Sequence, residues 1–270
     1  MGRFWSLFFL SVPILGVACF VWAMAGWWPL QGYWLPPNIN EHGQVIDNLF
    51  MFILYLTGII FVGTGVALFY FLWKYDAAQN TEPVKYSHGS HTLEVVWSII
   101  PAAALLFIAI YQMRAWADAK MYRPTVTVAG QTVPKPALAE VTARQFEWRI
   151  RYAGKDGIVG TPDDLQIVNE LHVPIDEDVV IKIKSMDVLH SFFLPNLRVK
   201  QDTVPGMKQH VWFRANRAGT YDIVCAELCG WGHYKMRGSL TVESREDFDR
   251  WIEKKTQEQM QSEFVAKGEE

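Results

Sequence analysis

Cysteine, net charge and basic clusters are scarce in this chain of 270 residues. It has three cysteines and a formal net charge of -3, with 25 Lys and Arg against 28 Asp and Glu. So few cysteines give little support for a disulfide framework. The lack of a basic run argues against nucleic acid as a partner. The sequence also has no Cys-x-x-Cys-His motif, so we expect no covalently attached haem in it.

Charge is also missing from three long segments in the first 113 residues. Residues 4–30, 49–73 and 95–113 contain no charged side chain, and each is long enough to cross a membrane as a helix. Ala23-Met24-Ala25 matches a signal-peptide cleavage site, so residues 1–30 form either an N-terminal transmembrane helix or a signal peptide. We favour the helix because the apolar run is long and only Arg3 precedes it. Residues 45–114 are a predicted transmembrane helical hairpin.

Basic residues in the connecting segments predict the orientation of these helices. The loop 31–47 has no Lys or Arg, whereas Arg3 precedes the first helix and Lys74 and Lys85 follow the second. Because basic loops stay on the cytoplasmic side, we expect a multi-pass protein of the inner (cytoplasmic) membrane. Everything after Arg114 then lies on the outer, periplasmic side.

The chain beyond residue 114 has the pattern of short strands. In residues 179–185 three aliphatic side chains alternate with Lys182 and Lys184, which are expected to point outward. Similar runs at 140–152 and 165–173 predict one strand each. About 130 residues of short strands predict an all-β sandwich or barrel over residues 115–245. Residues 246–270 are predicted to form a charged C-terminal helix.

Candidate metal ligands are concentrated in residues 225–236. Cys225, Cys229, His233 and Met236 offer two thiolates, an imidazole and a thioether, a set that suits copper, and His190 lies upstream at the end of a strand-like run. A mononuclear blue-copper site uses one thiolate, whereas two cysteines can bridge a pair of copper ions. A disulfide between the cysteines and a Cys2His2 zinc site are the alternatives, but neither gives Met236 a role.

This loop resembles that of a known family. Cys-x-Glu-x-Cys-x-x-x-His-x-x-Met, with a His in a Leu-His-Ser-Phe context, is similar to the binuclear copper centre (CuA) of cytochrome c oxidase subunit II. The resemblance implies a cupredoxin-like Greek-key fold, two copper ions bridged by the cysteines, and a magnesium ion shared with subunit I through the Glu227 side chain. The implied metal ligands are His190, Cys225, Glu227 (through its backbone carbonyl), Cys229, His233 and Met236.

The resemblance extends to two carboxylates outside the loop. Glu94 begins a Glu-x-x-Trp-x-x-x-Pro stretch like that of the family, where the Glu lies at the entrance of a proton channel. Asp202 matches a family carboxylate at the interface with subunit I. The alternative roles are an ordinary carboxylate at a helix start for Glu94, favoured there by the helix dipole, and a surface turn residue for Asp202.

One aromatic stretch departs from the family. Many members have Trp-Tyr-Trp above the copper centre, and the first Trp receives electrons from cytochrome c. This chain has Phe146-Glu147-Trp148 instead, so Phe146 stands at the electron-entry position and Trp148 matches the second Trp. Both side chains also suit core packing, which we favour. We therefore hypothesise that Trp231, within the metal loop, is the exposed docking and electron-entry residue.

The implied function is that of the electron-entry subunit of a proton-pumping cytochrome c oxidase. Cytochrome c or a small copper protein would donate electrons, and this chain would pass them to haem in subunit I, which reduces oxygen; the chain itself would have no catalytic residue and no haem. Other oxidase subunits and membrane lipid are the further expected partners. The alternatives are a membrane-tethered copper chaperone or sensor and a structural subunit of a quinol oxidase, whose relatives lack the copper ligands retained here.

Overall fold

The computed structural model describes residues 2–80, 82–83, 86–154 and 156–268. Lys85, which supports the predicted orientation, lies outside these residues. The chain divides into two compact units. One combines Met1–Pro36 with Asp47–Arg114, and the other combines Pro37–Ile46 with Ala115–Glu270. The second unit thus includes a short segment from the connection between the first two helices.

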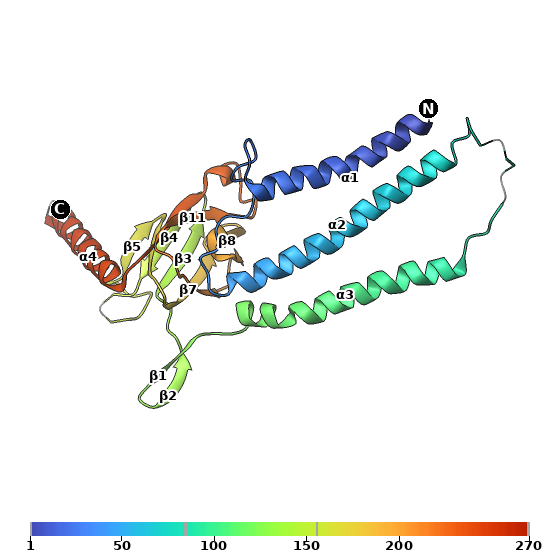
Figure 1. The fold of residues 1–270 in the computed structure, drawn as a ribbon. Helices are drawn as coiled ribbons and strands as arrows, with labels where there is room; N and C mark the ends of the chain where they lie inside the picture. The colour runs from blue at the N-terminus through green and yellow to red at the C-terminus, as the bar shows by residue number, and fades with distance from the viewer. Residues whose placement is uncertain (1, 81, 84–85, 155, 269–270) are drawn as a thin grey trace. The chain divides into compact units, whose positions relative to one another are not determined.

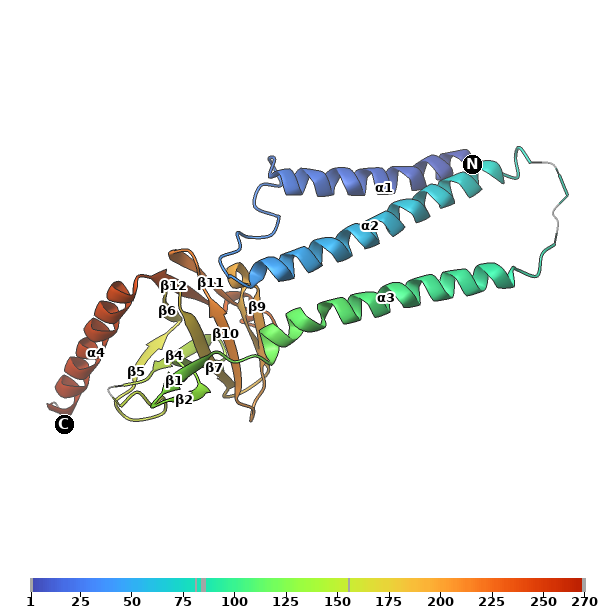
Figure 2. The same cartoon turned by 60° about the horizontal axis from the view of Figure 1, so that its bottom comes forward.

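The first unit is formed by three helices that lie side by side (Figures 1 and 2). They are α1 (Gly2–Ala25), α2 (Gly43–Lys74) and α3 (His91–Lys120), and each is long and apolar enough to span a membrane. The Pro13 ring of α1 packs against Gly65 of α2, where an added Cβ would lie 2.7 Å from Pro13 Cγ. The expectation of a helical hairpin with an additional N-terminal helix is confirmed.

Twelve strands lie among the described residues of the second unit. A two-stranded sheet pairs β1 with β2, and two five-stranded sheets have the orders β10-β7-β3-β4-β5 and β6-β12-β11-β8-β9. The bounds are β1 Thr125–Val128, β2 Gln131–Pro134, β3 Ala139–Arg144, β4 Glu147–Tyr152, β5 Leu165–Val168, β6 Glu170–Pro174, β7 Asp178–Ser185, β8 His190–Leu194, β9 Val199–Thr203, β10 Gln209–Arg214, β11 Gly219–Cys225 and β12 Arg237–Glu243.

The two large sheets share one hydrophobic core, as a β-sandwich requires. The largest fully buried side chains include Trp148 from one sheet and Phe192 from the other, with ring centroids 5.4 Å apart. The alternation predicted for β7 is confirmed, since its aliphatic side chains are buried while Lys182 and Lys184 are only partly so. The predicted all-β domain is therefore confirmed.

Two predicted strands are each divided in the structure. Residues 140–152 form the hairpin of β3 and β4, with Arg144 opposite Glu147 and only two residues between the strands. Gln145 and Phe146 are not typical turn residues, so the pattern looked continuous. Residues 165–173 divide at Asn169, whose φ of 59° lets the chain pass from one sheet to the other. Asn is one of the few residues that readily adopts this left-handed conformation.

Segment Pro37–Ile46, which ends within the first turn of α2, packs into the β-sandwich. Ile39 is fully buried in the core, and Asn40 pairs with Ala215 as an isolated bridge. Asn40 Nδ2 also donates a hydrogen bond of 2.8 Å to the Leu197 carbonyl. The sequence-based domain boundary at residue 115 did not include this segment.

The C-terminal helix α4 (Arg245–Gly268) begins directly after β12 (Figure 1). Ser244 stabilises its start, because its hydroxyl accepts a 3.1 Å hydrogen bond from the Asp247 amide. Phe248 is buried, and Trp251 stacks on His172 of β6 with ring centroids 3.7 Å apart. One face of α4 therefore packs against the hydrophobic core of the β-sandwich, and the opposite face carries the charged residues of the helix.

Candidate metal centre

The candidate metal centre lies where β8 and β11 adjoin. Cys225 is the last residue of β11 and pairs with Phe192 of β8. The Ala226 amide then donates a 3.1 Å hydrogen bond to the Ser191 carbonyl, which continues the pairing into the loop. As a result His190, the first residue of β8, comes to lie beside a cysteine 35 positions later in the chain.

Four side chains form a row in which each donor atom is near the next. His190 Nδ1 lies 3.9 Å from Cys225 Sγ, Cys225 Sγ lies 3.8 Å from Cys229 Sγ, and Cys229 Sγ lies 3.6 Å from His233 Nδ1. A disulfide would need the sulfur atoms about 2.05 Å apart. Both cysteines are therefore free thiols, and their spacing is that of two donors that share a metal ion about 2.3 Å from sulfur.

The row is not a single four-donor cluster. Among the described residues, the donor atoms of His190, Cys225 and Cys229 all lie within 4.8 Å of one another, and His233 is not part of that group. His233 lies nearest to Cys229, at the other end of the row from His190, and it also interacts with Cys225. The two thiols therefore occupy the centre, with one imidazole at each end.

Two further donors flank the thiols. Met236 is buried, and its Sδ lies 3.8 Å from Cys229 Sγ. The Glu227 backbone carbonyl lies 3.2 Å from Cys225 Sγ. All six candidate ligands from the sequence are thus brought together, and the residues present fit a soft metal such as copper.

His190 is oriented by Asp187. Its Nε2 donates a 2.8 Å hydrogen bond to Asp187 Oδ1, which leaves Nδ1 to face Cys225. Burial would raise the pKa of Asp187, but the Gln145 amide, His190 and the Val188 amide lower it below its ordinary value. A carboxylate on the outer nitrogen of a ligating His is a common feature of metal sites, because it fixes the ring and its tautomer.

The two thiols differ in acidity. Burial alone would raise the pKa of Cys225, but hydrogen bonds from His190 and from the backbone around the thiol lower it to about 6. Burial and the adjacent Cys225 raise the pKa of Cys229 to about 12. Burial would lower the pKa of His190, yet its contacts with Cys225 and Asp187 raise it. The centre therefore stabilises a Cys225 thiolate next to an imidazole.

The β3–β4 hairpin supports the metal loop from one side. Gln145 Nε2 donates a 2.5 Å hydrogen bond to the Cys229 carbonyl, and the Phe146 ring packs on Gly232, where an added Cβ would lie 2.6 Å from the ring. Gly232 leaves the space that this ring fills.

The sequence analysis did not identify Asp187 or Gln145 as parts of the site. The position of Asp187 three residues before His190 could have indicated its role, whereas nothing in the sequence indicated the role of Gln145.

The three candidate electron-entry aromatics lie in different environments. Trp148 is fully buried, with its ring centroid 6.3 Å from that of His190. Phe146 is partly buried against the core and contacts Trp231 edge to face at 5.1 Å. Trp231 is 81% exposed. Of the three, Trp231 is the one with a largely exposed ring, and Phe146 lies between it and the loop backbone.

The two carboxylates outside the loop belong to different parts of the chain. Glu94 is in the first turn of α3 with an exposed side chain, and its Oε2 lies 3.8 Å from His91 Nδ1. Asp202 is half-buried on β9, where it pairs with Ser191, the residue after His190. Asp202 is therefore one strand away from the metal centre.

Comparison with known families identifies both parts of the chain. The family model described as the cytochrome c oxidase subunit II transmembrane domain matches residues 34–115, and that of the periplasmic domain matches residues 153–244. The chain is 31% identical to the alternative cytochrome c oxidase subunit 2 of Bradyrhizobium diazoefficiens, over 82% of this chain and 83% of the relative.

Two other proteins are also similar to this chain. The cytochrome c oxidase subunit 2 of Thermostichus vulcanus is 28% identical over 80% of this chain and 77% of its own length. The crystal structure of the periplasmic domain of cytochrome oxidase subunit II (CoxB) of Bradyrhizobium japonicum is 27% identical over 47% of this chain and 98% of that chain, with a TM-score of 0.41.

Proposed function

Because this chain belongs to the cytochrome c oxidase subunit II family, we propose that its metal loop holds two copper ions. Family membership establishes the broader statements. The chain is the electron-entry subunit of a haem-copper oxidase, has other oxidase subunits as partners and is a membrane protein with its C-terminal domain in the periplasm. Copper as the metal agrees with the Cys and His donors.

The row of donors is the observation that supports two metal ions rather than one. A single tetrahedral ion needs all four donors around one point, whereas here His190 and His233 lie at opposite ends of the two thiols. Each thiol can then be shared between two ions, with one imidazole for each. The proposed ligands are His190, Cys225, the Glu227 carbonyl, Cys229, His233 and Met236.

The protein residues hold this donor set rigid. When bound, a pair of coppers supplies a centre that accepts and releases one electron at a time. The buried His190, Cys229 and Met236 exclude water from it, and Asp187 fixes the His190 ring. Gln145 and Phe146 hold the loop backbone in place. A donor set that does not rearrange lowers the cost of each electron transfer.

Copper content and electron paramagnetic resonance of the full-length chain test the proposal. We expect two coppers per chain and one unpaired electron spread over both. Cys229→Ser should abolish the shared signal, whereas Cys19→Ser, a matched change in α1, should leave it intact. One copper with a mononuclear spectrum, or zinc, would contradict the proposal. Two exposed coppers lost rapidly to a chelator would instead support a chaperone or sensor.

We also propose that Trp231 is the point at which the donor, cytochrome c or a small copper protein, docks and delivers electrons. Trp231 and Leu228 are 81% and 76% exposed on the same loop, next to the thiols. Trp231→Ala should slow electron uptake at least tenfold with copper content unchanged. Leu228→Ala, which removes neighbouring apolar surface, should have a smaller effect. Equal rates for Trp231→Ala and the unchanged protein would exclude this role.

The remaining proposals concern three carboxylates. Glu94 would admit protons to subunit I, a role supported by its position at the start of a helix in a motif that matches the family. Glu94→Gln should therefore slow proton uptake by the assembled oxidase without affecting copper reduction. Asp202 would face subunit I, so Asp202→Asn should weaken the association of this chain with subunit I.

Glu227 would share a magnesium ion with subunit I. When Mn²⁺ replaces that ion, the bound Mn²⁺ should give an electron paramagnetic resonance spectrum that Glu227→Gln changes.

A further inference from the structure

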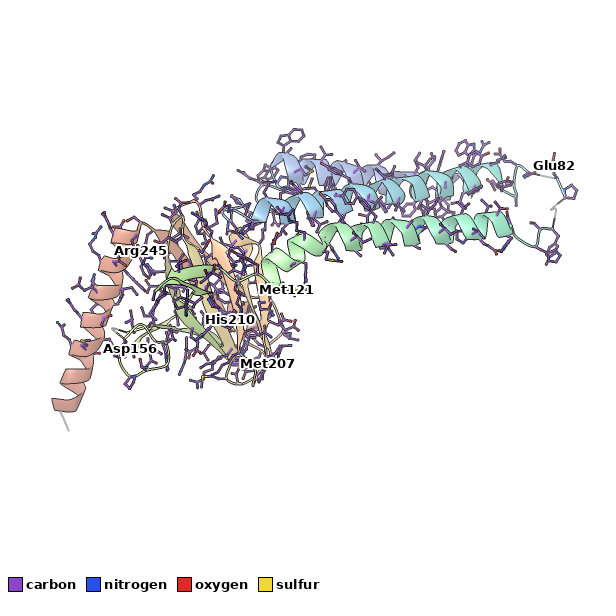
Figure 3. All side chains as sticks on the ribbon, turned by 90° about the horizontal axis from the view of Figure 1, so that it is seen from below. Glu82, Met121, Asp156, Met207, His210 and Arg245 are labelled. Atoms are coloured by element: carbon purple, nitrogen blue, oxygen red, sulfur yellow. The ribbon has the colours of Figure 1, made fainter. Side chains whose placement is uncertain are left out.

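Two adjoining hollows form a basic pocket on the β-domain, and none of the described residues that line them belongs to the metal loop. The first, of about 450 Å³, lies between the end of α3 and β10, and the second, of about 320 Å³, adjoins it. Arg123 and His210 line both. We define the basic pocket by five side chains: Lys120, Arg123, Lys182, Lys208 and His210. Figure 3 labels His210 on the domain and Met121, the residue after Lys120.

The pocket concentrates positive charge in a chain with a net charge of -3. Among the described residues that line the two hollows, none is a carboxylate. Asp202 offsets part of the charge of Lys120. Burial, together with the nearby Arg123 and Lys182, lowers the pKa of His210. The pocket thus has an excess of positive charge that an anion would neutralise.

The hydrogen-bonding groups of the pocket are mainly donors. Arg123 Nη2 lies 3.2 Å from His210 Nδ1, and since a guanidinium can only donate, His210 accepts there and keeps its N–H on Nε2. Lys120 Nζ donates to the Lys200 carbonyl and to Gln201 Oε1, at 2.6 and 2.8 Å, which positions its ammonium group at the pocket wall. A group with several acceptor oxygens, such as a phosphate, suits this arrangement.

Several residues that line the pocket follow directly on a membrane span in the chain. The apolar part of α3 ends at Met113, and with a rise of 1.5 Å per residue Lys120 lies about 10 Å further along the same helix. Trp116 and Tyr122, which also line the first hollow, have more than half of their surface exposed. Trp and Tyr are enriched where membrane spans leave the bilayer. The pocket therefore combines cations with aromatic side chains typical of the interface.

We propose that the basic pocket binds the phosphodiester headgroup of an anionic phospholipid from the outer leaflet. Arg123 and Lys208 contact the phosphate oxygens, and Trp116 and Tyr122 pack on the glycerol and the first acyl carbons. The exposed aromatic wall favours a lipid over a free phosphate, which offers no apolar part for that wall to cover.

Native mass spectrometry of the full-length chain in detergent tests this, with phosphatidylglycerol, phosphatidylcholine and inorganic phosphate as the added ligands. We expect one phosphatidylglycerol per chain at a concentration at least tenfold below that needed for phosphatidylcholine. A surface cation contributes about fivefold to binding of an anionic lipid, so the double variant Arg123→Gln, Lys208→Gln should weaken it about 25-fold. The matched variant Lys254→Gln, Lys255→Gln, on α4, should not.

Three results would overturn the proposal. One is equal binding of the two lipids, or a preference for phosphatidylglycerol that the double variant keeps. Another is inorganic phosphate that displaces the lipid at equal concentration, which would identify a site for soluble phosphate. The third is loss of the preference in the assembled oxidase, which would assign the pocket to contact with a neighbouring subunit. A double variant that fails to fold is recognised by its copper content, and the single variant Lys208→Gln, which should weaken phosphatidylglycerol binding about fivefold, then replaces it.

Discussion

The packing of Ile39 into the β-sandwich leads to a quantitative prediction about the stability of the periplasmic domain. Ile39 lies in the connection before α2, yet its side chain has no exposed surface. Its amide donates to the Asn196 carbonyl and its carbonyl accepts from the Asn216 amide, each at 2.9 Å. The backbone is therefore fixed on both sides, and Ile39→Ala should leave a cavity rather than allow the segment to move inward.

The expected cost follows from the atoms removed. Ile39→Ala deletes three buried carbons, and burial of each contributes about 0.8 kcal/mol, to which the residual cavity adds. We expect a destabilisation of about 3 kcal/mol, within the range for buried Ile→Ala changes. With a urea dependence of about 2 kcal/mol per molar, the unfolding midpoint should fall by about 1.5 M.

Pulse proteolysis in urea, applied to the full-length chain in detergent, measures this midpoint for the periplasmic domain. Ile158→Ala is the matched control, because Ile158 is 61% exposed on the same domain and loses the same atoms. Its midpoint should stay within about 0.3 M of the unchanged chain. If Ile39→Ala and Ile158→Ala gave the same midpoint, segment Pro37–Ile46 would not be part of the folded domain. A fragment that starts at residue 115 should be destabilised at least as much as Ile39→Ala.

Three further predictions concern other contacts. Asp187→Asn should weaken copper binding about 10- to 100-fold, measured by competition with a chelator, because the neutral amide holds the His190 ring less firmly. Trp251→Ala should destabilise the domain by about 2 kcal/mol in the same urea assay, since it removes the stacking on His172, whereas the exposed Met260→Ala should have little effect. Residues 1–25 should remain on the mature protein, because α1 packs closely on α2, and intact mass would show them.

Each of these has a clear opposite result. Unchanged copper affinity in Asp187→Asn would mean that the backbone alone orients His190. Equal stability of Trp251→Ala and Met260→Ala would mean that α4 is not held by its aromatic contact. A mature chain that begins at Gly26 would identify residues 1–25 as a signal peptide, the alternative to a retained helix.

The sequence by itself determined the features that depend on local composition. Three uncharged runs of about 20 residues or more predict membrane-spanning helices whatever their neighbours are. Five of the six proposed ligands fall within residues 225–236, so residue type and spacing were enough to suggest copper there. Alternating residues likewise predicted the strands and which faces of them are buried.

Only the tertiary structure decided the features that depend on residues distant in the chain. His190 meets Cys225 because β8 pairs with β11, and the row of donors that supports two metal ions follows from that pairing. The packing of Ile39 and the basic pocket, where Lys120 lies near His210, depend on contacts across many strands. Local pattern reports which face of a segment is buried, but the choice of neighbour is made by the packing of the whole core, and residue spacing does not record it.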